Sequence, residues 1–428
     1  MAASQSLSSH RVRWVTWSGF ALVLALAPLV LTSGLSITML SQIGIAIIVC
    51  LSYNMLLGQG GMLSFGHAVY SGLGSYVAIH ALNAASAGSL PIPVVLVPLV
   101  GGLAGMFFAV LLGYVTTKKA GTTFAMITLG IGELVFAMSL MVPEFFGGEA
   151  GVAGNRVVGE PFMGISFGPP RQVYYLIAIY TFLSVAGMYA FTRTPLGRML
   201  NAVRDNPERV EFVGYNAQHV RYLAFIVAGF FAGIGGGLGA LNFEIVTAEV
   251  VGAARSGGYL LFTFLGGATF FFGPIIGAVL MVLAFVLFSE LTKAWLLYLG
   301  LIFMFMVMFA PGGIASLIMM NVRVARFGQL RGLIPHYLVL ALTAIVALAG
   351  ASALIEMIYQ VQLEGSDAAL RFLGVTLQPG QALHWLLAGA VLLVGGVLFE
   401  WARRRFARQW GTVQEHIEAR IKQLEASA

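Results

Sequence analysis

The chain has 428 residues, of which 59% are hydrophobic and 9% charged, and its mean hydropathy is +0.91. A soluble domain needs a polar surface and cannot have this composition, so the sequence predicts an integral membrane protein. We expect the formal net charge of +6 to reflect membrane topology and not nucleic-acid binding. The single cysteine, Cys50, excludes a disulfide or a thiolate metal site within the chain.

Apolar runs separated by short polar patches extend along most of the chain. A helix needs about 20 mainly apolar residues to cross a hydrocarbon core of ~30 Å. Alternating strand patterns are absent from the sequence, so we predict an all-α polytopic helical bundle with about 10–12 transmembrane or half-spanning segments, some broken or re-entrant. The expected segments lie near residues 15–32, 34–57, 62–82, 91–116, 122–142, 172–191, 219–242, 258–272, 273–289, 293–310, 335–355 and 383–400.

Cationic residues cluster at alternate ends of these segments. If the segments simply alternate, one side of the membrane holds Arg11, Arg13, Lys118, Lys119, the run from Arg193 to Arg221, Arg323, Arg326, Arg331, Arg403, Arg404, Arg405 and Arg408. The positive-inside rule makes this side cytoplasmic, with both termini there; the family resemblance described below implies a bacterial inner membrane. A cleaved signal peptide is the alternative interpretation of the first segment.

The stretch GQGGMLSFGH interrupts two apolar segments. Its glycines, Gly58, Gly60, Gly61 and Gly66, allow the helix to break, and Gln59, Ser64 and His67 supply polar groups. Irregular backbone at membrane depth is tolerated where it is buried in protein or lines a cavity, so this break is a candidate lining of a translocation path. The alternative is a turn at the cytoplasmic end, with Ser64 capping the next helix and His67 hydrogen-bonded in the core.

Glu133 lies near the middle of the apolar run from Thr122 to Val142. A carboxyl group at this depth is costly unless it is protonated, paired or facing a cavity, which makes it a functional candidate. Thr122, Thr123 and Thr128 share the segment and supply hydroxyls. A protonated glutamate bonded to a neighbouring helix is the structural alternative.

Glycines recur at two further places. Gly229, Gly233 and Gly237 form a four-residue repeat, which predicts close helix packing and not a nucleotide-binding loop. The stretch GGATFFFGPIIG contains a second helix break at Gly266, Gly267, Gly273 and Pro274; it fits a re-entrant half-helix or a tight turn between two spans.

The most polar stretch of the membrane region runs from Arg193 to Arg221 on the expected cytoplasmic side. Pro195 and Pro207 can each open a helix, Asp205 and Asn206 can cap the second one, and Gly214 with Asn216 can close it. We therefore predict a short helix-turn-helix unit outside the membrane. It is either a solvated loop or a docking surface, and its paired caps favour docking.

The residues from about Ser41 to Leu317 resemble the M-type permease subunit of high-affinity branched-chain amino acid importers, an ABC transporter family. The resemblance is carried by NMLLGQGGMLSFGHAVYSGLGSYVA, AGTTFAMITLGIGEL, RTPLGRMLNAVRDNPERVEFVGYN, LAFIVAGFFAGIGGGL, FLGGATFFFGPIIGA and MFAPGG, in the family's order. It implies a permease core at 41–320, which an N-terminal transmembrane segment at 1–40 precedes. Residues 321–428 form a C-terminal extension beyond the family's core, in which the sequence predicts two transmembrane segments and a cytoplasmic amphipathic tail.

The same resemblance implies partners: a second permease subunit, two cytoplasmic ATPase subunits, a periplasmic solute-binding protein and the lipid membrane. It identifies the cytoplasmic unit as an ATPase-coupling helix and assigns that role to Arg193, Pro195, Gly197, Arg198, Arg204, Asp205, Asn206, Glu208 and Gly214. Many importer coupling loops carry paired alanines before the glycine, whereas this chain has Val210, Glu211, Phe212 and Val213. The implied solute is a branched-chain or similar small amino acid, with urea, amides or aromatic acids as alternatives.

None of the lysines lies in a GxxxxGK pattern followed by Ser or Thr, so we expect no cofactor and no ATP site on this chain, with ATP used by partner subunits. We likewise expect no catalytic residues and no metal site, because no metal-ligand spacing or nucleophile-base set occurs. An ion- or proton-coupled secondary transporter is the alternative function; it predicts internal duplication and more intramembrane charge.

Overall fold

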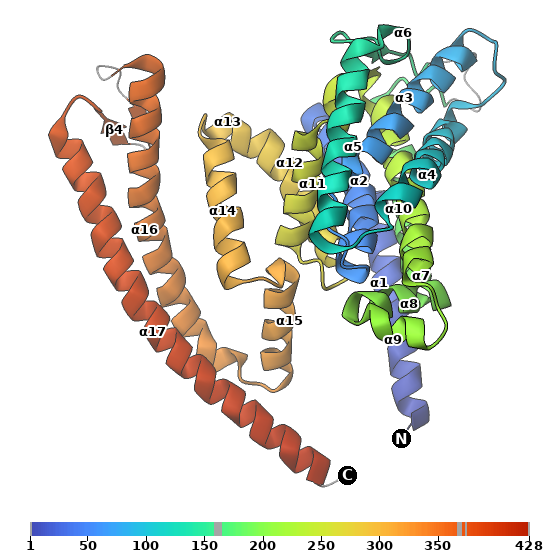
Figure 1. Ribbon diagram of the computed structural model, residues 1–428. Helices are drawn as coiled ribbons and strands as arrows, with labels where there is room; N and C mark the ends of the chain where they lie inside the picture. The colour runs from blue at the N-terminus through green and yellow to red at the C-terminus, as the bar shows by residue number, and fades with distance from the viewer. Residues whose placement is uncertain (1, 158–164, 366–369, 373–374, 427–428) are drawn as a thin grey trace. The chain divides into compact units, whose positions relative to one another are not determined.

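The computed structural model describes residues 2–157, 165–365, 370–372 and 375–426, and Figure 1 shows its helical architecture. In this part of the chain eight helices are long and apolar enough to cross a membrane, or nine if one bent pair is a single span. The predicted all-α membrane bundle is confirmed. The chain divides into two compact units, residues 1–286 with 305–315 and residues 287–304 with 316–428.

The first unit contains most of the permease core predicted at 41–320, whereas residues 287–304 and 316–320 of that range fall in the second unit. Its elements are α1 Ala2–Val30, α2 Gly34–Asn54, η1 Met55–Gln59, α3 His67–Ser86, η2 Val94–Leu96, α4 Val97–Thr116, α5 Gly121–Met141, α6 Pro143–Phe146, β1 Val152–Ala153, α7 Pro170–Arg193, α8 Pro195–Asp205, α9 Pro207–Phe212, α10 Ala217–Phe243, β2 Ile245–Val246, η3 Ala248–Val251, α11 Ala253–Gly266 and α12 Gly273–Leu283.

Helix α10 packs against α3 and α4 through small residues, as the glycine repeat predicts. A Cβ atom on Gly233 would lie 2.2 Å from the carbonyl oxygen of Gly101 on α4, and one on Gly229 would lie 2.4 Å from Ala109 Cβ. On another side of α10, a Cβ on Gly236 would lie 1.8 Å from the Ser71 carbonyl oxygen on α3. These backbones can therefore approach only because no side chain separates them.

Short helices lie at two opposite ends of the first unit (Figure 1). At one end lies α6, and β1 pairs antiparallel with β2 nearby, Val152 opposite Val246 and Ala153 opposite Ile245. At the other end lie α8 and α9. The helices between them expose large apolar side chains such as Leu103, Phe107 and Leu111 of α4, as expected of a lipid-facing surface.

Helices α11 and α12 form a tight hairpin around the second glycine break. Gly266 ends α11, Gly267 has φ +113°, and Gly273 and Pro274 open α12. A Cβ on Gly266 would lie 2.2 Å from the Gly273 carbonyl oxygen. With 14 residues α11 is about 21 Å long and too short to cross the hydrocarbon core alone, which favours the half-helix interpretation.

The second unit is dominated by a hairpin of two long helices, α16 Leu330–Glu364 and α17 Ala382–Ala426, joined through strands β3 Leu370–Phe372 and β4 Val375–Leu377. The helices approach closely at glycines: a Cβ on Gly350 would lie 2.4 Å from the Leu392 nitrogen. The helices between α12 and α16 are η4 Ala284–Phe288, α13 Ser289–Leu291, α14 Trp295–Phe309 and α15 Gly313–Arg326. Their residues are divided between the two units.

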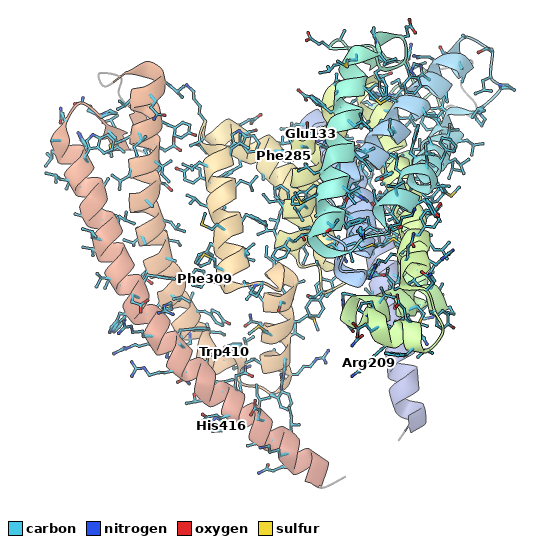
Figure 2. The ribbon with its side chains drawn as sticks, in the orientation of Figure 1. Glu133, Arg209, Phe285, Phe309, Trp410 and His416 are labelled. Atoms are coloured by element: carbon cyan, nitrogen blue, oxygen red, sulfur yellow. The ribbon has the colours of Figure 1, made fainter. Side chains whose placement is uncertain are left out.

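The amphipathic tail predicted after Arg408 continues α17 without a break, and Figure 2 shows Trp410 and His416 on it. Val413 and Ile417 are buried with Val324 of α15 and Leu333 of α16 in a small core. The apolar spacing of the tail therefore serves packing against its own unit.

Candidate functional site

The segment Pro195–Phe212 folds as the predicted helix-turn-helix. Thr194 caps α8 by accepting a hydrogen bond from the Gly197 nitrogen (3.2 Å), and Asn206 caps α9 by accepting one from the Arg209 nitrogen (3.0 Å). Asn216 caps the following helix, α10, through the His219 nitrogen (3.0 Å). Each helix start thus has a side chain that satisfies a free backbone donor.

Three apolar side chains stand out from this unit. Phe212 is 89% exposed, Val213 73% and Tyr215 50%, at the end of α9. Leu200 and Val203 of α8 and Val210 of α9 are buried, and Leu200 lies against Gly60 of the glycine break. Large apolar side chains so exposed at the polar end of a bundle mark an interaction surface. Sequence reasoning treated Phe212 and Val213 only as a departure from the family pattern.

The predicted coupling residues divide into an inner and an outer set. Gly197 is buried, and a Cβ there would lie 2.3 Å from the Phe191 carbonyl oxygen; Gly214 has φ +92°, which favours glycine. Arg193 stacks over the Tyr189 ring at 5.0 Å and donates to its hydroxyl. Gly197 and the half-buried Asn206 are the inner members, and the exposed members are Arg193, Pro195, Arg198, Arg204, Asp205, Glu208 and Gly214. The neighbouring Arg209, labelled in Figure 2, is also exposed.

Arg204 connects this unit to the first glycine break. Its guanidinium donates to the carbonyl oxygen of Gly58 and pairs with Asp205 at 2.9 Å. A Cβ on Gly61 would lie 2.8 Å from Arg204 Cγ, so the loop and the arginine are in direct contact. The residue therefore belongs both to the predicted coupling unit and to the break.

The break itself is held by hydrogen bonds in the protein core. The tyrosine hydroxyl of Tyr53 donates to the Ser64 carbonyl oxygen at 2.9 Å. His67 Nε2 lies 2.8 Å from Ser52 Oγ, and because that hydroxyl donates to Val49, the imidazole is the donor. The cap by Ser64 that the alternative interpretation requires is not formed: the N-cap of α3 is Gly66, and Ser64 Oγ is buried without a partner among the described residues.

Residues 60–66 run from the end of η1 alongside α5. The Phe65 nitrogen donates to Thr128 Oγ1 at 3.1 Å, and a Cβ on Gly66 would lie 2.2 Å from the Thr128 carbonyl oxygen. Thr128 lies seven residues, or about 10 Å, from the start of α5. The break thus enters the helical bundle, where most of its residues are buried in protein.

The predicted path residues fall into two groups. Ser64, His67 and Thr128 are buried and gather at the break, and Gln59 is half-buried at the end of η1. Thr122, Thr123 and Glu133 are instead exposed on the outer face of α5, where Figure 2 shows Glu133. Met126, Leu129 and Leu134 surround Glu133 on this face. A carboxyl group among apolar side chains requires a polar partner or a water-filled path.

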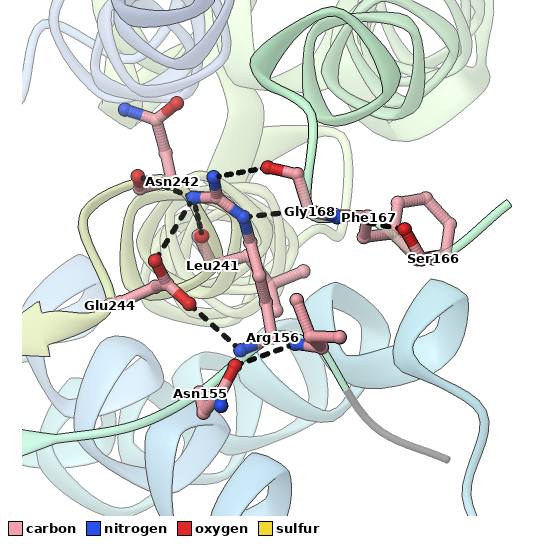
Figure 3. Close-up of polar contacts among 9 residues, drawn as sticks. Asn155, Arg156, Ser166, Phe167, Gly168, Leu241, Asn242 and Glu244 are labelled. Atoms are coloured by element: carbon pink, nitrogen blue, oxygen red, sulfur yellow. Dashed lines mark hydrogen bonds and ion pairs between the residues drawn. The ribbon is translucent and has the colours of Figure 1, made fainter. Parts of the chain in front are cut away.

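At the end of the first unit opposite α8 and α9, Arg156 bonds to several segments of the chain, and we call this arrangement the arginine clamp (Figure 3). Arg156 donates from its Nε to the Phe167 carbonyl oxygen (2.7 Å) and from its Nη atoms to those of Gly168, Leu241 and Asn242. It also pairs with Glu244 at 3.4 Å, and its side chain is only 13% exposed. Glu244 has φ +56° and caps the end of α10. The clamp ties the segments flanking α7 and α10 together.

A cavity of about 60 Å³ lies between α2, α3, α10 and α11. Ser71 and Ser75 of α3 and Tyr259 and Arg255 of α11 bring polar groups to it, and glycines 235, 236 and 239 form its α10 wall. Arg255 was not identified as a candidate from the sequence. Its only signal there was a cationic residue in the first turn of the apolar helix α11. A cation lining a cavity inside a bundle is a candidate contact for an anionic group of a solute.

The chain is similar to known membrane permeases. A family model described as branched-chain amino acid transport system / permease component matches residues 35–311. The chain is 27% identical over 336 residues to the high-affinity branched-chain amino acid transport system permease protein LivM of Salmonella typhimurium, covering 73% of this chain and 77% of that one. No solved structure matches the chain.

Two further relatives extend the comparison. The high-affinity branched-chain amino acid transport system permease protein BraD of Pseudomonas aeruginosa is 24% identical over 247 residues, which cover 55% of this chain and 78% of BraD. The guanosine ABC transporter permease protein NupQ of Bacillus subtilis is 27% identical over 115 residues, which cover 26% of this chain and 34% of NupQ.

The fold and these matches define a multi-pass membrane permease subunit of the ABC transporter class. Because the family model covers more than half of its residues, the chain belongs to the family of branched-chain amino acid transport system permease components. Its relatives are transport subunits and not enzymes. Membership also means that the chain works with other ABC transporter components in a membrane.

Proposed function

We propose that this chain forms, with a second permease, the membrane path of an importer for branched-chain or similar small amino acids. Two separate cytoplasmic ATPase subunits use ATP to drive it, and a periplasmic binding protein delivers the solute; the chain itself carries no cofactor. The observation that supports this most strongly is the exposed α8–α9 unit, whose Arg204 contacts the glycine break.

The ATPase docks on α8 and α9. Phe212, Val213 and Tyr215 supply the apolar centre of the contact, and the exposed Arg198, Glu208 and Arg209 supply a charged rim. Buried aromatic anchors surrounded by polar contacts are the usual energetic centre of a protein interface. The cationic clusters of the sequence support a cytoplasmic location for this unit and for both termini, in the inner membrane.

The second permease covers the outer face of α5. Glu133, Thr122 and Thr123 then face a path between the two permeases and not lipid, which removes the cost of exposing a carboxylate to hydrocarbon. Arg255, which lines the cavity between α2, α3, α10 and α11, supplies a cation for the solute's carboxylate. The names of the LivM and BraD relatives support a branched-chain amino acid as the solute.

A pull-down of the tagged full chain in mild detergent tests the assembly. We expect a second permease and two ATPase chains per transporter to co-purify, with ATP hydrolysis in the eluate. The double charge reversal Arg198→Glu and Arg209→Glu should release the ATPases and leave the second permease bound. Recovery of the chain alone, active in transport, would favour a secondary transporter instead.

A further inference from the structure

A cavity of about 140 Å³ lies between α16 and α17, in the part of the chain that follows the family match. It is lined by Pro335, His336, Val339, Trp401, Ala402 and Arg405. All of these residues belong to the second unit, and the two helices that carry them pack against each other at Gly350 and Gly395. The cavity therefore lies within a single hairpin of two helices.

The cavity lies where both helices leave their apolar stretches. On α16 the residues before Tyr337 include Arg331 and His336, and an unbroken apolar run follows from Leu338 to Leu342. On α17 the apolar run ends at Phe399, and Glu400 to Arg405 follow. Trp401 sits at this junction, the depth at which tryptophan favours the membrane–water interface.

The charge at the cavity is positive and unbalanced. Arg403 and Arg404 both bond to Glu400, at 2.7–2.8 Å, and so neutralise the one carboxylate nearby on α17. Arg405 instead stacks over the Trp401 ring at 4.0 Å, and in the described residues no carboxylate pairs with it. His336 is half-buried on the opposite wall. The Nδ1 of His336 donates to the Gly332 carbonyl oxygen at 3.3 Å, so Arg405 is the donor that an anion entering the cavity would meet.

The walls beyond these polar groups are apolar. Val339 and Ala402 line the cavity, and the hairpin surface that continues from it exposes Leu338 and Leu342, each 66% exposed, and Val397, 71% exposed. A free inorganic anion would gain nothing from this surface, whereas an acyl chain would cover it. Basic pockets between membrane helices on the cytoplasmic side are suited to acidic lipid headgroups.

We propose that this cavity binds the headgroup of an anionic phospholipid, with Arg405 contacting the phosphate, His336 lining the opposite wall, Trp401 fixing the headgroup level, and the acyl chains lying along α16 and α17. This proposal does not depend on the solute or on the ATPase. It gives the C-terminal extension a function as a lipid-binding module.

Native mass spectrometry of the purified full chain tests the site, with phosphatidylglycerol and phosphatidylcholine of the same acyl chains as probes. We expect selective retention of phosphatidylglycerol, roughly five-fold weaker after Arg405→Gln, since one arginine near the surface contributes about 1 kcal/mol. Arg408→Gln is the matched control, because Arg408 is exposed on the same helix outside the cavity. Arg405→Lys should retain most of the binding.

A second pair of variants tests the cavity without changing charge. Val339→Phe fills the cavity and should weaken phosphatidylglycerol binding, whereas Ile334→Phe, at an exposed aliphatic residue of α16 outside the cavity lining, should not. Equal retention of both lipids, or equal loss in Arg405→Gln and Arg408→Gln, would overturn the proposal. Displacement of the lipid by millimolar inorganic phosphate would show a free-anion site instead, and would overturn it as well.

Discussion

The guanidinium of Arg204 on α8 donates to the main-chain carbonyl oxygen of Gly58, at the π-helical end that follows α2. This bond joins the proposed ATPase-docking unit to the break that enters the bundle beside α5. A movement of α8 would therefore pull on residues 58–61, and through Phe65 and Thr128 on the helix that carries Glu133.

Replacing Arg204 with glutamine should uncouple transport from ATP hydrolysis. A hydrogen bond from this partly exposed arginine is worth about 1 kcal/mol, so we expect uptake to fall several-fold while the ATPase still co-purifies. Uptake and ATP hydrolysis measured on the same preparation check this. Lys119→Gln, at an exposed cation between α4 and α5, is the control for lost charge; an equal loss of uptake there would refute a special role for Arg204.

Phe212→Ala should weaken ATPase binding. A buried aromatic anchor contributes at least about 2 kcal/mol, or roughly thirty-fold in affinity. The measurement is the amount of ATPase retained on the tagged chain at increasing dilution. Phe107→Ala removes an equally large exposed ring from α4 and should retain the ATPase; if Phe212→Ala also does, the docking surface lies elsewhere.

Glu133→Gln tests whether α5 faces the path. The variant keeps the size of the side chain and removes its charge, so assembly should persist while uptake falls by roughly ten-fold, the equivalent of about 1.4 kcal/mol. Uptake is measured at equal amounts of assembled transporter. Glu144→Gln, just beyond α5, is the matched control, and full uptake by Glu133→Gln would remove this residue from the path.

Gly236 and Gly239 offer a matched pair on one helix. A Cβ on Gly236 would lie 1.8 Å from the Ser71 carbonyl oxygen, whereas a Cβ on Gly239 would have no atom of a neighbouring segment within 4 Å. Gly236→Ala should destabilise the protein by roughly 1–3 kcal/mol through overpacking, and Gly239→Ala should not. Thermal unfolding in detergent measures both; equal midpoints would contradict the close contact of α3 and α10.

Arg156→Lys should destabilise the end opposite α8 and α9. Lysine cannot reach the four carbonyl oxygens that the guanidinium satisfies, and each buried group left without a partner costs about 1–3 kcal/mol. A lower melting temperature, with Arg171→Lys as the exposed control, is the expected outcome. An unchanged melting temperature in both variants would show that the arginine clamp does not contribute to the stability of the protein.

Local patterns in the sequence predicted the helices well. The apolar runs near 122–142 and 219–242 correspond to α5 and α10, and prolines 195 and 207 each open a helix of the exposed unit. These features depend on residues close in sequence, namely caps, proline positions and hydrophobic length. They require no knowledge of the partners across the bundle.

Contacts between distant segments were not predictable in the same way. The bond from Phe65 to Thr128 and that from the Ala68 nitrogen to Ser256 bring segments 63 and 188 residues apart together. Arg255 and the exposed ring of Phe212 become candidates only when the cavity and the surface are known. The burial of His67 likewise depends on Ser52 of another helix.

Uptake of labelled leucine by proteoliposomes containing the chain with its co-purified partners tests the central claim most directly. With binding protein supplied outside and ATP inside, we predict uptake that requires ATP and is unaffected by a protonophore. Uptake by the chain alone, driven by an ion gradient and abolished by the protonophore, would contradict the account.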